Sequence, residues 1–137
     1  MKNFDRKNLV ELAVSAAENS YSPYSNFCVG AALLCDDGEI ILGTNVENAS
    51  YGGAICAERT AFCTAVAKGK KNFVAIAIIG HRRGEEKMDF CSPCGICRQF
   101  MSELVDRDFL VVLSNGDEIR EYTMSEILPL AFDKSLI

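Results

Sequence analysis

The chain has 137 residues, of which 49% are hydrophobic, and this is typical of one globular domain with a single core. Its formal net charge of −5 argues against a nucleic-acid partner, because phosphate binding needs clustered Lys and Arg. No apolar run is long enough to cross a membrane, and the opening MKNFDRKNLVEL lacks the apolar centre of a signal peptide. We therefore expect one domain spanning residues 1–137 in the cytoplasm, with seven cysteines that are free, catalytic or metal-bound rather than paired.

The first predicted element is a helix within residues 3–20. Apolar residues recur at helical spacing from Leu9 to Ala16, and Asp5 is a suitable N-cap. Phe4 and Leu9 occupy the two positions of a hydrophobic staple. The turn residues of YSPYSN predict the end of this helix.

Apolar strands and helices alternate along the rest of the chain. In order, the sequence predicts a strand at 27–35, its hairpin partner at 39–48, a helix at 56–69, a strand at 73–80, a helix at 92–105, a strand at 109–114, a weaker edge strand at 118–124 and a short helix at 124–132. We interpret the charged stretch HRRGEEKMDF as a solvated surface turn. This alternation predicts an α/β fold, a three-layer α-β-α sandwich, and the early hairpin makes its sheet of about five strands mixed.

Reactive side chains stand at the start of the second predicted helix. The run CAERTAFCTAVAKG opens with Cys56, Glu58 and Arg59, which is an unusual way to begin an apolar helix. A helix N-terminus stabilises negative charge, so a cysteine placed there is favoured as the thiolate.

The third predicted helix also carries cysteines at its start. In FCSPCGICRQF, Ser92 is a suitable N-cap and Pro93 fits the first helical position, which places Cys94 and Cys97 on one face of the opening turns. Neighbouring strands of an α/β sheet bring such helix starts together. We therefore expect Cys94 and Cys97 to converge with Cys56 on one Zn²⁺ ion.

The identity of the fourth zinc ligand separates a structural site from a catalytic one. Cys91 or the lone His81 would close a structural site, and Cys91 also extends a C-x-x-C-x-x-C run that hints at an iron–sulfur ligand set. That run has no further cysteine, and Pro93 places Cys91 outside the helix, so we predict that Cys91 is not a ligand. Three ligands, an open position and the nearby Glu58 describe a metal-activated water with a proton shuttle.

Two motifs in this order carry a family resemblance. CAE at 56–58 followed by PCGIC at 93–97 resembles the zinc-dependent nucleoside deaminases, in which a glutamate beside the metal is not a ligand. More narrowly, FCVGAALL, NVENASYGGAICAERTA and SPCGICRQ resemble the small cytidine deaminases, which are usually homotetramers. The resemblance implies hydrolytic deamination of cytidine and 2′-deoxycytidine to uridine and 2′-deoxyuridine plus ammonia, as in pyrimidine salvage. Zinc-bound hydroxide would attack C4, and Glu58 would carry protons to ring N3 and the leaving amine.

The same resemblance implies roles for further residues. We interpret Arg59 as a donor to the ligand sulfurs that restores the acidity of a metal carrying three thiolates. Asn45 and Glu47, which a strand would point to one side, match the residues that hold the ribose 3′-OH. The remaining matches are Phe27, which packs against the base, Ala57, whose backbone N–H meets the base carbonyl, and Tyr51 and Phe132, which complete a neighbouring subunit's site.

Three other functions stay open at this point. A blasticidin-type deaminase shares the zinc motifs, although Asn45 and Glu47 favour a ribose-bearing substrate. A zinc-stabilised interaction module would have four protein ligands rather than three plus water. A thiol redox protein would need a labile disulfide between Cys94 and Cys97 and no metal.

Overall fold

One mixed sheet of five strands, in the order β2-β1-β3-β4-β5, forms the centre of the molecule. The structure is a computed structural model and describes residues 3–137. Only the β3–β4 pair is parallel, and the other neighbouring strands are antiparallel. The strands are β1 (Phe27–Cys35), β2 (Ile40–Thr44), β3 (Phe73–Arg82), β4 (Leu110–Ser114) and β5 (Ile119–Thr123).

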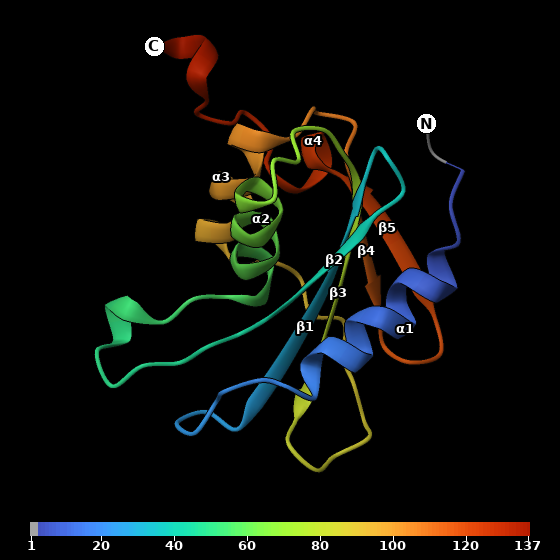
Figure 1. The fold of residues 1–137 in the computed structure, drawn as a ribbon, viewed down its shortest axis with the longest axis vertical. Helices are drawn as coiled ribbons and strands as arrows, with labels where there is room; N and C mark the ends of the chain where they lie inside the picture. The colour runs from blue at the N-terminus through green and yellow to red at the C-terminus, as the bar shows by residue number, and fades with distance from the viewer. Residues whose placement is uncertain (1–2) are drawn as a thin grey trace.

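Helices cover both faces of this sheet, as Figure 1 shows. Helix α1 lies on one face, and α2, α3 and α4 lie on the other. The prediction of a three-layer α/β sandwich with a mixed sheet is therefore confirmed. The helices are α1 (Arg6–Ala17), α2 (Ala57–Ala67), α3 (Gly95–Leu104) and α4 (Met124–Ile127), with short 3-10 turns η1 (Tyr51–Gly53) and η2 (Lys134–Leu136). Within residues 3–137 we find no helix with the length and apolar character needed to span a bilayer.

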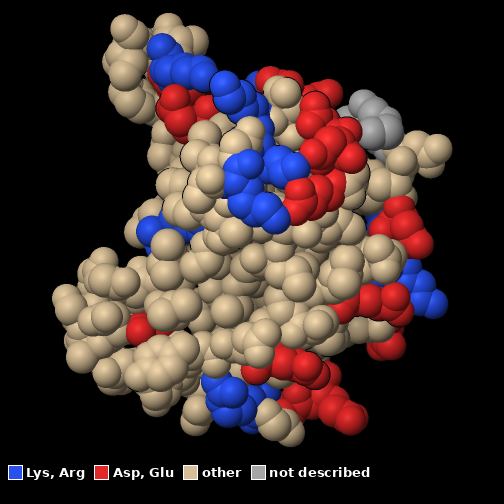
Figure 2. Space-filling view, viewed as in Figure 1, with Lys and Arg blue, Asp and Glu red and all other residues tan. Residues whose placement is uncertain are grey.

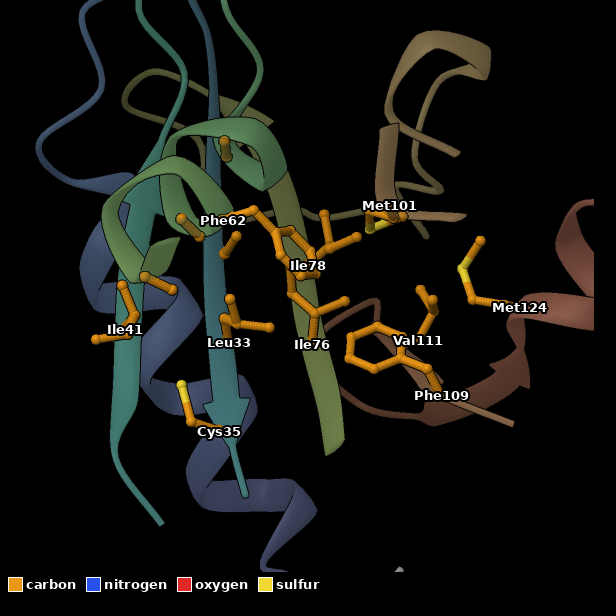
Figure 3. Packing of buried hydrophobic residues seen from close by; sticks show 14 of the residues in the cluster. Leu33, Cys35, Ile41, Phe62, Ile76, Ile78, Met101, Phe109, Val111 and Met124 are labelled. Carbon is orange, nitrogen blue, oxygen red and sulfur yellow. The ribbon is translucent and has the colours of Figure 1, made fainter. Parts of the chain in front are cut away.

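The central strands are apolar throughout because both of their faces are covered. On β3, Ile76 and Ile78 point into the core beneath α2 and α3, around the ring of Phe62 (Figure 3). Ala75 and Ala77, which alternate with them, belong to the core beneath α1. This arrangement explains why the sequence of this strand shows no polar alternation.

Two glycines allow helices to approach the sheet closely, one on each face. A Cβ atom at Gly30 in β1 would lie 1.9 Å from the backbone oxygen of Ala13 in α1. A Cβ atom at Gly43 in β2 would lie 2.4 Å from the backbone oxygen of Ala57, at the start of α2. Both separations are far below van der Waals contact, so no larger residue fits at either position without moving a helix.

Several predicted boundaries differ from the structure. Strand β3 continues to Arg82, so His81 and Arg82 of the predicted surface turn belong to the strand. Strand β2 ends at Thr44 rather than near residue 48, and only isolated bridges continue it through Val46. Helix α3 begins after Cys94, which is its N-cap, so Ser92 and Pro93 precede the helix. Helix α4 ends at Ile127 rather than at 132. Pro129 disfavours helical geometry at the residue before it and offers no N–H to continue the helix.

Candidate metal centre and active site

Three cysteine sulfurs converge where α2 and α3 begin. Cys56 is the N-cap of α2, Cys94 is the N-cap of α3, and Cys97 lies in the first turn of α3. Neither N-cap side chain makes a capping hydrogen bond. The sulfur atoms all lie within 4.8 Å of one another, and those of Cys56 and Cys94 are 3.9 Å apart.

This geometry fits a zinc ion. A tetrahedral zinc with Zn–S bonds of about 2.3 Å holds its sulfurs about 3.8 Å apart. Within residues 3–137, Cys56, Cys94 and Cys97 form the only group of His, Cys, Asp or Glu with this metal-binding spacing. The three thiols can therefore hold one zinc ion and leave its fourth position to a non-protein ligand.

The sheet topology explains why these thiols meet. Helix α2 leads into β3, and α3 connects β3 to β4, which is the parallel neighbour of β3. Both helices therefore run opposite to the same strand direction and begin at the carboxyl edge of the same two strands. This is the edge where open α/β sheets place their sites.

Positive charge stabilises the sulfur cluster. The Nη2 group of Arg59 donates to Cys56 Sγ at 3.7 Å. The pKa of Cys56 is lowered to about 5, first by a hydrogen bond from Cys97 and then by the bond from Arg59. The Nε atom of Arg59 is buried and has no partner. Because the thiolate is the form that binds metal, this environment prepares Cys56 for zinc.

Glu58 is the buried acid of the site. It lies in the first turn of α2 and is only 4% exposed, and burial is the main cause that raises its pKa above the ordinary value of 4.5. A buried carboxyl group with a raised pKa holds a proton more readily than an exposed one, which suits a group that accepts and returns a proton during a reaction.

One cavity of about 440 Å³ joins the sulfur cluster to most of the predicted substrate residues. Its lining residues are Val29, Asn45, Glu47, Tyr51, Gly52, Ala54, Ile55, Cys56, Ala57, Glu58, Arg59, Cys91, Ser92, Cys94 and Ile96. Two predicted residues lie elsewhere. Phe27 lines the adjoining cavity, and Phe132 is 62% exposed on the segment that follows α4.

Hydrogen bonds fix the side chain of Asn45. Its Oδ1 accepts from Ser20 Oγ at 2.6 Å and from the Val29 N–H at 3.0 Å, and its Nδ2 donates to the Phe27 carbonyl at 2.9 Å. These bonds assign the amide orientation and use both acceptor positions of Oδ1. One Nδ2 proton remains, so Asn45 can act only as a donor toward a ligand in the cavity.

The carboxylate of Glu47 is held beside it. It accepts hydrogen bonds from the backbone N–H groups of Tyr24 and Ser25, at 2.9 and 3.1 Å, and from the Ser25 hydroxyl. The hydrogen bond from Ser25 is the main cause that lowers the pKa of Glu47. The sequence around Ser25 does not indicate that this segment holds the Glu47 carboxylate, because its turn residues predict only the end of a helix.

Neither candidate for a fourth protein ligand joins the sulfur cluster. Cys91 lines both cavities but lies outside the group of residues with metal-binding spacing, and burial is the main cause that raises its thiol pKa to about 11. The ring of His81 lies in the adjoining cavity, with Nδ1 2.8 Å from the carbonyl oxygen of Arg82. All seven cysteines, including Cys94 and Cys97, are free.

Comparisons with known proteins agree with this geometry. A family model described as the cytidine and deoxycytidylate deaminase zinc-binding region matches residues 4–113. A cytidine deaminase from Halalkalibacterium halodurans is 49% identical over 130 residues, which cover 93% of this chain and 94% of that protein. A crystal structure of cytidine deaminase from Burkholderia pseudomallei has a TM-score of 0.85 at 45% identity and covers 94% of this chain and 100% of its own. A blasticidin-S deaminase from Bacillus cereus is 31% identical over 130 residues, 93% of this chain and 91% of that protein. The chain therefore belongs to the cytidine and deoxycytidylate deaminase family.

Proposed function

We propose that the chain hydrolyses cytidine and 2′-deoxycytidine to uridine and 2′-deoxyuridine, with release of ammonia. The observation that carries this proposal is a buried carboxyl group, Glu58, in one cavity with Cys56 and Cys94 of the sulfur cluster. The relatives named as cytidine deaminases support it, because they match nearly the whole chain. Three free cysteines at one site also require a reducing compartment, so we place the reaction in the cytoplasm.

Proton transfer is the task of Glu58. Zinc bound at the three thiols would supply a Lewis-acidic position that lowers the pKa of water. Glu58 takes the proton that water loses when its oxygen bonds to C4 of the base, and returns it to ring N3. It then takes the second proton, from the new C4–OH group, and passes it to the amine, which leaves as ammonia when the C4–N bond breaks and the C4 carbonyl forms. The raised pKa of Glu58 suits an acid that must take up and release protons in turn.

Substrate orientation depends on residues around the cavity. We call Asn45 and Glu47 the sugar pair, because one can donate and the other can accept, which matches a sugar hydroxyl. Ala57 is the first residue of α2, where backbone N–H groups have no partner within the helix, so its N–H suits the base carbonyl. We assign Phe27 to packing beside the base.

The same proposal includes a homotetramer with shared sites. Tyr51 is 80% exposed at its own cavity, and Phe132 is exposed away from that cavity. Exposed aromatic side chains of this kind are typical of protein interfaces. Phe132 would thus complete the site of a neighbouring subunit.

A direct assay tests the reaction. We expect the ultraviolet absorbance of cytidine to fall when the purified protein is added, and a zinc chelator to abolish this change. Glu58→Gln should retain zinc, and its turnover should fall by about 10²–10⁴-fold, the usual contribution of a positioned acid–base group. Glu103→Gln, at an exposed position of α3, is the matched control and should keep full activity. Full activity in a zinc-loaded Glu58→Gln protein, or faster turnover of blasticidin S than of cytidine, would contradict the proposal.

A further inference from the structure

Both residues of the sugar pair are held by one segment, residues 20–26, which connects α1 to β1. Ser20, at its start, donates to Asn45 Oδ1. The backbone N–H groups of Tyr24 and Ser25 donate to Glu47. Backbone bonds from Tyr21 N–H to Asn45 and from Glu47 N–H to Tyr21 complete this attachment. The position of the sugar pair therefore depends on the position of this segment.

Arg83 fastens the same segment from its other side. It belongs to the charged stretch 81–90 and is the first residue after β3, in the loop at the foot of the sheet (Figure 1). Its backbone N–H donates to the Asn26 carbonyl at 2.8 Å. Its Nη2 donates to Ser22 Oγ at 2.9 Å and to the Ser20 carbonyl at 3.1 Å. The side chain of neighbouring Arg82 makes only a 3.5 Å contact with the Ser25 carbonyl.

The two serines connect the Arg83 guanidinium to Asn45 in a fixed direction. Ser20 and Ser22 are buried, and their hydroxyl oxygens are 3.0 Å apart. Ser20 has one hydroxyl proton, and Asn45 Oδ1 has none, so Ser20 donates to Asn45. With its proton used toward Asn45, Ser20 Oγ can only accept from Ser22 Oγ, which itself accepts from Arg83 and also lies 3.7 Å from Cys28 Sγ. Each bond in such a chain strengthens the next, and here the chain begins at a positive charge.

We propose that Arg83 is a positioning residue for the sugar pair, and that it acts on Asn45 through Ser22 and Ser20 without touching the substrate. This inference rests on the proposed function. It replaces the interpretation of the stretch 81–90 as only a solvated surface turn. The lowered pKa of Glu47, to which the charge of Arg83 also contributes, agrees with it.

The inference has a specific consequence for substrate choice. A displaced Asn45 or Glu47 loses its contact with the sugar hydroxyl, whereas the reacting base and the sulfur cluster stay in place. Loss of Arg83 should therefore reduce turnover of 2′-deoxycytidine, which has a 3′-hydroxyl group, much more than turnover of 2′,3′-dideoxycytidine, which has none. A general loss of folding would reduce both substrates equally.

The experiment compares kcat/KM for these two substrates in the wild type, Arg83→Met and Arg82→Met, each with its zinc content and Tm measured. For Arg83→Met we expect the ratio of deoxycytidine to dideoxycytidine kcat/KM to fall about tenfold, which is the scale of one lost charge-assisted hydrogen bond. Arg82→Met, the matched control, should keep the wild-type ratio. Ser22→Ala breaks the same chain without removing a charge, so it should lower the ratio as well, and it carries the test if Arg83→Met does not fold.

The outcomes are separable. A wild-type protein that deaminates neither cytidine nor deoxycytidine overturns the proposed function and this inference with it. An active wild type whose substrate ratio is unchanged in Arg83→Met, or in Ser22→Ala where that variant carries the test, overturns this inference alone. If the deoxycytidine to dideoxycytidine ratio falls as far in Arg82→Met as in Arg83→Met, the effect comes from positive charge in this region. That result would also overturn the inference, because the Arg82 side chain does not bond to Ser20 or Ser22.

Discussion

Arg59 is the cationic side chain bonded to the sulfur cluster, and its guanidinium donates to Cys56 from a partly buried position. Three thiolates bring three negative charges to a divalent metal, which weakens its pull on a fourth ligand. Hydrogen bonds to a ligand sulfur withdraw part of that charge. We therefore predict that Arg59 affects both metal retention and catalysis.

Arg59→Met keeps much of the side-chain volume and removes every donor. We expect zinc affinity or turnover to fall about 10- to 100-fold, the usual effect of losing a group that supports a metal ligand. Competition with a chromogenic chelator measures the first quantity, and steady-state kinetics at saturating zinc measures the second. Arg59→Lys, which keeps the charge, should recover part of the loss, and wild-type values in both assays for Arg59→Met would refute this role.

Glu47 gives a pH dependence whose sign follows from its lowered pKa. The unfolded chain binds a proton at the ordinary value of 4.5, and the folded chain binds it only at a lower pH. The stability that this carboxylate contributes is therefore fully present above about pH 4.5 and is lost as the pH falls through the lowered pKa. Urea unfolding at a series of pH values should show that the deficit of Glu47→Gln relative to wild type shrinks on acidification below pH 4.5. A deficit that is constant down to acid unfolding would contradict the assignment.

At the scale of elements, the two close-packing glycines separate folding from metal binding. Both Gly30→Ala and Gly43→Ala should destabilise the protein by about 1–3 kcal/mol or more, because a helix must move away from the sheet. Only Gly43 contacts α2, whose first residues follow Cys56. We expect Gly43→Ala to weaken zinc binding as well, whereas Gly30→Ala, which displaces α1 on the opposite face, should leave it unchanged. Thermal unfolding and a chelator titration of both variants check this. If Gly43→Ala binds zinc as tightly as Gly30→Ala, then moving α2 away from the sheet does not disturb the zinc site.

Much of this architecture follows from local sequence patterns. The strand at 27–35 is predicted at its observed bounds, because a fully apolar run and the DDG turn after it leave few alternatives. Asp5 caps α1 as expected, through a bond from the Asn8 N–H. Helix starts are harder to predict, since Ser92 and Cys94 can both precede a helix, and the structure has Cys94 as the N-cap.

The sequence likewise predicts only part of the site. Its chemical groups are visible in the sequence because Cys56, Glu58, Cys94 and Cys97 fall into two short motifs. The contacts of Arg83 are not visible, because they join segments about 60 residues apart, 63 positions to Ser20 and 61 to Ser22. Contacts of that kind depend on how loops close, and composition predicts only that such loops are polar.

The whole molecule carries charge unevenly. Figure 2 shows Lys, Arg, Asp and Glu gathered at the top, along the right margin and at the bottom of this view, whereas the loop at the lower left, which follows β2 in Figure 1, carries almost none. That loop includes the exposed Val46 and Tyr51, and the ring of Tyr24 lies edge-on to that of Tyr51. The segment after α4 adds Leu130 and Phe132, both exposed. Exposed apolar side chains of this kind are typical of protein interfaces.

Mixing a weakened variant with an inactive one tests the proposed shared sites. Phe132→Ala should lower kcat/KM and keep zinc, and Glu58→Gln should be inactive for the reason given above. When the two are refolded together, subunits with an intact Glu58 can receive Phe132 from their neighbours, so activity should rise above the sum of the separate preparations. Sedimentation measures whether mixed tetramers form. Mixed tetramers without regained activity would place Phe132 outside the neighbouring site.

The thiol N-caps of α2 and α3 also affect stability. A serine or threonine there would satisfy a free backbone donor and contribute about 0.5–2 kcal/mol, and both helices forgo this contribution. Without metal, the first turns of α2 and α3 should therefore open locally, and their amides should exchange hydrogen faster than the rest of each helix. Cys56→Ser should slow that exchange in the chelated protein, while it abolishes turnover. We therefore expect bound zinc to lengthen the lifetime of the folded chain as well as to support the reaction.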